Sequence, residues 1–182
     1  MKRLAMLLCL LTLPAAAIAA DYTVQPAASK LAFSGSFQGA GFNGSFSRWT
    51  AAIRYDPANL AASKFDVVVE LASAKTGDSD RDGALPGSDF FDVAKFPKAH
   101  FVTTAFHRDG ARVIADGMLT LRGVTRPASL QVNFQPHGSG ATLDASGSVK
   151  RLDFGVGGGD YADTSVIGND VKITAHLQLA AK

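Results

Sequence analysis

The chain has 182 residues, a length that suits one domain, and its 18 Lys and Arg residues nearly balance 16 Asp and Glu residues. Because no Lys/Arg cluster stands out, nucleic acid is not an expected partner. The one cysteine, Cys9, lies in the first 19 residues, so the rest of the chain has no thiol for a disulfide framework, a CxxC redox pair or a cysteine nucleophile.

The first 19 residues have the composition of a secretory signal peptide. Lys2 and Arg3 precede the apolar run Leu4 to Leu13, and small residues follow that run. We expect cleavage near Ala19 or Ala20, which predicts export to the periplasm.

The mature domain is expected to span residues 20–182. Its formal charge is zero, since the loss of Lys2 and Arg3 leaves 16 basic against 16 acidic residues. No segment in it has the run of about twenty apolar residues that a membrane helix needs, so we expect no transmembrane segment after signal removal.

Apolar and polar residues alternate with a period of two through most of this domain, a pattern typical of strands with one apolar face. Short turns rich in Gly, Asp, Asn or Pro separate eight such segments. In chain order their apolar faces are Leu31, Phe33 and Phe37; Trp49, Ala51, Ile53 and Tyr55; Phe65, Val67, Val69 and Leu71; Phe101, Thr103 and Ala105; Val113, Ala115, Gly117, Leu119 and Leu121; Leu130, Val132 and Phe134; Leu143, Ala145, Gly147 and Val149; and Val171, Ile173, Ala175, Leu177 and Leu179. The fourth is the weakest, because Val102 and Phe106 fall on its other face. Eight short amphipathic strands predict an all-β, antiparallel barrel that can enclose one small ligand.

The segment Asp78 to Phe96 breaks the alternation and predicts a short helix or a turn-rich cap. Asp78 to Gly83 also matches the first half of a calcium loop, with Asp89 at its twelfth position. A strand rather than a helix precedes it, Arg81 adds positive charge, and Pro86 stiffens its middle. Aspartates before a helix also serve as caps. We therefore predict no metal site, with calcium as the open alternative.

Other motifs carry little chemistry. Gly39 to Gly44 matches G-x-G-x-x-G, but the strand Trp49 to Tyr55 follows it instead of a helix, so we interpret it as a flexible loop. The four histidines lack metal-ligand spacing, and no G-x-S-x-G or S-x-x-K motif occurs. The sequence therefore predicts no catalytic residues and a protein that is not an enzyme.

Small residues on the inward faces indicate unfilled volume in the barrel. They are Ala51, Ala115, Gly117, Ala145, Gly147 and Ala175. An empty void costs about 24 cal/mol per Å³, and an apolar chain inside the barrel would restore the missing contacts. We expect a ligand-binding tunnel lined by Phe33, Phe37, Trp49, Ile53, Val67, Val69, Phe101, Ala115, Gly117, Leu119 and Val132, with Phe42, Phe46, Phe90 and Phe91 closing its mouth. The alternative is that these rings only pack the end of the barrel.

Several motifs stand together in an order that resembles one family. They are Gly44-x-Phe46, Asp80-Arg81-Asp82-x-x-Leu85, Ser88-Asp89-Phe90-Phe91-Asp92-Val93-x-x-Phe96-Pro97, Gly117-x-Leu119-Thr120-x-x-Gly123-Val124-Thr125 and Arg151-x-Asp153-Phe154-Gly155. The chain resembles the YceI family of periplasmic polyisoprenoid-binding proteins over essentially all of 20–182. The resemblance implies an eight-stranded, extended lipocalin-like barrel with a short helical insertion, holding a long isoprenoid or fatty-amide chain. The segment Gly83 to Gly87 departs from the family pattern, which has more charged, helix-favouring residues there, so the resemblance implies the fold but not the length of the helical insertion.

The stretch Gly155 to Tyr161 is similar to family members found with a diheme b-type cytochrome of the inner membrane, which implies an isoprenoid quinone as ligand and that cytochrome as a possible partner. The expected function is a periplasmic carrier of a long polyisoprenoid lipid or quinone, without a cofactor. Two alternatives remain open: a module that modulates such a cytochrome, and an enzyme acting on a bound lipid or quinone. The sequence leaves the oligomeric state undetermined.

Overall fold

The structure, a computed structural model, describes residues 20–182, and the predicted signal peptide and its cleavage site at Ala19 or Ala20 fall at or before the start of that range. The strands are β1 Ala20–Val24, β2 Lys30–Phe37, β3 Ala40–Phe46, β4 Trp49–Tyr55, β5 Lys64–Glu70, β6 Ala74–Lys75, β7 Lys98–Asp109, β8 Arg112–Leu121, β9 Val124–His137, β10 Gly140–Lys150 and β11 Asp170–Ala181. The helix α1 spans Ser79–Ala84, and the 3-10 turns are η1 Pro26–Ala28, η2 Leu60–Ala62, η3 Leu71–Ser73, η4 Arg151–Phe154 and η5 Gly159–Tyr161.

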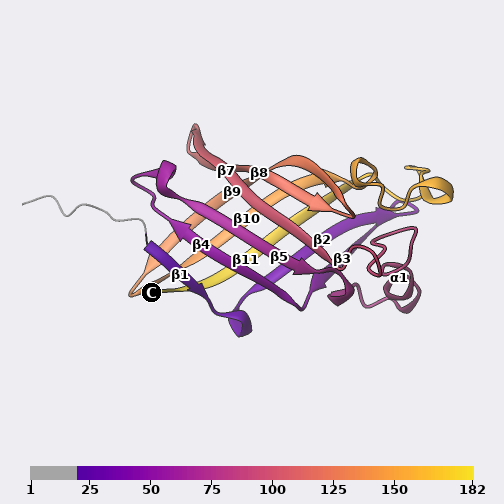
Figure 1. Cartoon of the computed structure of the whole chain (residues 1–182), viewed down its shortest axis with the longest axis horizontal. Coiled ribbons are helices and arrows are strands. Elements are labelled where there is room, and N and C mark those ends of the chain that lie inside the picture. Colours follow the sequence, from indigo (N-terminus) through magenta and orange to yellow (C-terminus); the bar gives the residue numbers. More distant parts are fainter. Residues whose placement is uncertain (1–19) are drawn as a thin grey trace, which may run out of the picture.

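These segments form a closed, antiparallel, eight-stranded barrel, which confirms the predicted fold class. Three of the eight barrel strands are each interrupted and consist of two segments, namely β1 with β2, β3 with β4, and β5 with β6. Both β1 and β2 pair with β11, while β3 pairs with β6 and β4 pairs with β5. Pairing of β1 with both β4 and β11 closes the sheet. Figure 1 shows an elongated barrel with α1 at one end and β1 and the C-terminus at the other.

The segment that we interpreted as a flexible loop is the strand β3, so that interpretation was wrong. A two-residue turn joins β2 to β3, with both Gln38 and Gly39 in the left-handed region, at φ 50° and 77°. Such a turn matches the twist of the strands that it connects. Gly44 lies opposite Phe33, whose ring occupies the space where a side chain at position 44 would stand. The glycines of this stretch therefore belong to a strand covered by a ring.

The predicted inward face of β7 is wrong beyond Thr103, because the strand contains a β-bulge there. Thr103 pairs with Gly117 but Ala105 pairs with Asp116, so one extra residue reverses the alternation. Ala105 is consequently exposed rather than inward, and Phe106 packs into the interior. The bulge explains why Val102 and Phe106 had disagreed with one regular face.

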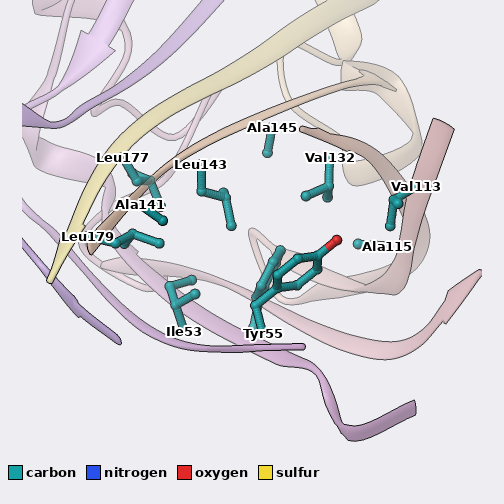
Figure 2. Close-up of a cluster of buried hydrophobic side chains, with 11 residues drawn as sticks. Ile53, Tyr55, Val113, Ala115, Val132, Ala141, Leu143, Ala145, Leu177 and Leu179 are labelled. Atoms are coloured by element: carbon teal, nitrogen blue, oxygen red, sulfur yellow. The ribbon is translucent and has the colours of Figure 1, made fainter. Parts of the chain in front are cut away.

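One end of the barrel is filled by side chains. Five aromatic rings there, which we call the aromatic plug, are those of Tyr22, Tyr55, Phe65, Phe106 and Phe134. Aliphatic side chains from opposite walls meet beside them, as Figure 2 shows for Ile53, Leu143 and Leu177. Because Tyr22 belongs to β1, the plug lies at the end that carries β1 and the C-terminus, away from α1 (Figure 1).

No helix within residues 20–182 is long and apolar enough to cross a membrane.

Candidate ligand-binding cavity

Between the aromatic plug and α1 the barrel contains a large apolar cavity of about 910 Å³. Its floor includes Ile53, Phe65 and Leu143, which also belong to the filled end. Its walls come from the inward faces of all eight barrel strands, and its outer end is bordered by α1 and by the segment 151–168. Pockets of a few hundred to a thousand Å³ with mostly apolar walls are typical of small-molecule sites.

Most of the residues that we expected to bind a ligand lie around this cavity. They are Phe33, Phe37, Phe42, Phe46, Trp49, Ile53, Val67, Val69, Phe90, Phe91, Phe101 and Leu119. Because β4 and β5 pair in register, Trp49 stands opposite Val69 and Ala51 opposite Val67, so alternate residues of both strands face the interior. The small residues Ala51, Ala145, Gly147 and Ala175 also line it.

Three expected residues do not line the cavity. Ala115 and Val132 are buried in the filled end, at 0% and 5% exposure. At Gly117 the ring of Phe101 and the carbonyl of Val102 take the space that a side chain would need. Small residues on β8 therefore make room for neighbouring protein groups.

The rim of the cavity carries exposed apolar side chains. Phe37, Tyr161 and Val166 are 41%, 43% and 39% exposed, and all three border the opening. The Gln38 backbone N–H donates to the Val166 carbonyl at 2.7 Å, which joins the β2–β3 turn to the segment 151–168. Sequence reasoning missed this segment as part of the site. Its only signal is the group of apolar residues, Tyr161, Val166 and Ile167, in a stretch otherwise rich in Gly and Asp.

The buried guanidinium of Arg151 holds that segment in place. Arg151 is 5% exposed, and its Nε, Nη1 and Nη2 groups donate to backbone carbonyls alone. The acceptors are Val156, Gly157, Tyr161, Ile167 and Gly168. Burial lowers the pKa of Arg151 from its ordinary value. All five donors of the side chain are thus used to shape the rim.

The aspartates of the possible calcium loop have structural partners. Asp78 caps α1 by accepting the Arg81 backbone N–H at 2.9 Å. Asp82 accepts the Thr76 backbone N–H and hydroxyl at 2.7 and 2.8 Å, and these bonds, the backbone one first, hold its pKa below the usual range. Between residues 20 and 182, no three His, Asp or Glu side chains gather as metal ligands. The absence of calcium binding stays a prediction.

The side chain of Arg122 joins two other segments at the rim to the β8–β9 turn. Arg122, in the β8–β9 turn, donates from Nη1 to the Gly155 carbonyl and from Nη2 to the Ser88 carbonyl. Thr120 and Thr125 lie opposite each other beside this turn, with their hydroxyl oxygens 2.8 Å apart. The turn therefore fastens the segment after α1 to the segment after β10.

Residues 22–179 match the family model of the YceI-like domain. The chain is 31% identical over 149 residues to Protein YceI of Escherichia coli O157:H7, covering 77% of this chain and 78% of that protein. Among solved structures, Burkholderia cenocepacia BcnA matches with a TM-score of 0.81 and 30% identity, over 87% of this chain and 99% of that one. A polyisoprenoid binding domain from Saccharophagus degradans, implicated in plant cell wall breakdown, matches with a TM-score of 0.66 and 18% identity, over 91% and 100%.

Proposed function

Because this chain belongs to the YceI family, and because its barrel holds a large apolar cavity, we propose that it binds a long isoprenoid lipid or isoprenoid quinone and carries it through the periplasm. The cavity carries the proposal, since its walls are mostly apolar and suit the tail of such a lipid. The name of the Saccharophagus degradans domain agrees with such a ligand, although that likeness concerns the fold.

The size of the cavity suits a chain of several isoprene units. At about 910 Å³ the cavity lies near the upper end of the range of about 300–1,000 Å³ that is typical of ligand pockets, so it has room for an apolar chain of several five-carbon units. Each buried CH₂ contributes about 0.8 kcal/mol before ordering costs, so even a few units supply a strong driving force. A longer chain would extend past the rim formed by Phe37, Tyr161 and Val166.

The proposed periplasmic location is supported by the signal-like composition of residues 1–19. The proposal of a quinone head group is supported only by the resemblance of Gly155 to Tyr161 to family members found with a b-type cytochrome. A soluble carrier has a physical purpose in that setting, because a chain of this length is poorly soluble in water.

The proposal is tested on mature protein purified from a bacterial host without detergent. Organic extraction followed by mass spectrometry should recover a stoichiometric apolar compound, and the stripped protein should rebind geranylgeraniol, a twenty-carbon prenyl alcohol. Recovery of no such compound together with no rebinding would overturn the carrier proposal. Chemical conversion of the rebound alcohol during incubation would instead favour an enzyme.

A further inference from the structure

The opening of the cavity carries more negative than positive groups. Six charged side chains border the cavity: the carboxylates of Asp78, Asp80, Asp160 and Asp163, and the guanidinium groups of Arg81 and Arg151. They come from α1 with its cap and from the segment 151–168, so they lie at the α1 end, away from the aromatic plug. The rest of the cavity lining has no charged residue.

Both arginines are already engaged by the protein. Arg151 donates to backbone carbonyls with all of its nitrogens and is 5% exposed. Arg81 lies over the ring of Phe42, 4.3 Å from its centroid, and its Nη2 is 3.7 Å from Asp78. An anionic ligand would have to compete with these contacts.

Three of the carboxylates are not neutralised by a cationic side chain of the described residues. Within the described range 20–182, Asp80, Asp160 and Asp163 form no ion pair. Asp163 accepts the Ser165 hydroxyl and backbone N–H at 2.6 and 2.8 Å, and these bonds hold its pKa below the usual range, which keeps it ionised.

The filled end sets the direction of a bound amphiphile. A polar head placed at the plug would lose its water among apolar walls, so the tail points inward and the head stays at the opening. We propose that this opening selects the head group by charge, accepting neutral or cationic heads and rejecting phosphates and carboxylates. This inference rests on the proposed function, since it concerns the same cavity.

The test compares three ligands that share one twenty-carbon tail: geranylgeraniol, geranylgeranyl amine and geranylgeranyl phosphate. Binding to stripped protein is followed by the fluorescence of Trp49, which lines the cavity. At low salt, we expect the alcohol and the amine to bind at least tenfold tighter than the phosphate. The difference should shrink at 1 M salt, where the screening length falls to about 3 Å.

The matched variant is Asp80→Asn/Asp160→Asn/Asp163→Asn, which removes charge but keeps an oxygen acceptor at each position. It should raise phosphate affinity several-fold and change alcohol affinity much less. Asp109→Asn, at the last residue of β7 and at the plug end, is the control and should change neither. If the phosphate binds the unmodified protein as well as the alcohol does, or if the triple variant strengthens both equally, the charge inference fails while the carrier proposal stands. If no prenyl ligand binds, the carrier proposal fails and the inference fails with it.

Discussion

The rings of Tyr55 and Phe134 lie with their centroids 4.6 Å apart and their planes tilted by 39°, and this contact is the centre of the aromatic plug. Tyr22 meets Phe134 edge-on at 5.5 Å, and Phe106 meets Tyr55 at 6.2 Å. Burial raises the pKa of Tyr55 above its ordinary value. Rings packed in this way contribute about 0.5 to 1.5 kcal/mol per pair beyond the area that they bury.

Phe134→Ala should therefore lower the free energy of unfolding by about 3 kcal/mol, through lost burial and the void left among the rings. Urea denaturation measures this difference. The control is Phe37→Ala, at the exposed rim, which should change stability by less than about 0.5 kcal/mol. Similar losses in the two variants would show that the plug does not carry the stability of that end.

Val69→Asp should weaken ligand binding at least about tenfold, because a carboxylate facing the apolar cavity must stay unpaired or take up a proton. Val68→Asp is the matched control. Val68 is the preceding residue on β5, pairs with Thr50 and His100, and does not line the cavity. Binding is titrated with geranylgeraniol on stripped protein, and an equal loss in both variants would contradict the assigned faces of β5.

Trp49 should report the chemistry of the ligand. It is the one tryptophan of the chain and lines the cavity opposite Val69. A long-chain quinone should quench its fluorescence saturably, since a quinone ring accepts energy or an electron at short range. A prenyl alcohol should bind without comparable quenching. Quenching of the same size by both would mean that the emission follows a general change around the indole.

Arg151→Met should lower the free energy of unfolding by about 3 kcal/mol or more, because buried carbonyls lose their donors. Hydrogen exchange should rise mainly in residues 156–168, which those bonds hold. Lys150→Met, at the exposed neighbouring residue, is the control and should leave both measurements almost unchanged. Exchange that rises uniformly over the barrel would argue against a local role.

Millimolar calcium or a chelator should leave the melting temperature unchanged, because Asp78 and Asp82 are held by the Arg81 and Thr76 hydrogen bonds. Calcium present at 100 times its dissociation constant would add about 2.7 kcal/mol to stability. Thermal melts in the two buffers measure the difference. An upward shift of several degrees with calcium would contradict the prediction.

The sequence was informative wherever strands are regular, because a period of two assigns faces directly: Trp49, Ile53, Val67 and Val69 all line the cavity. It failed at β3, where Gly44 replaces an inward side chain and the ring of the opposite Phe33 covers it. The prediction of faces failed again after Thr103, because no residue pattern in the sequence marks the β-bulge there. The rim segment depends on the bonds of Arg151, which join residues up to 17 positions away and follow no local pattern.

The aromatic plug leaves the described barrel, residues 20–182, with its cavity open at the α1 end and blocked at the other. A molecule that enters tail-first must therefore back out along the path by which it came. If the protein carries the proposed lipid, the membrane or protein that supplies the lipid and the one that receives it would have to use the same opening. Under the proposed carrier function, exchange would then proceed in two separate steps, with the barrel released from the membrane or protein that supplies the lipid before it meets the one that receives it.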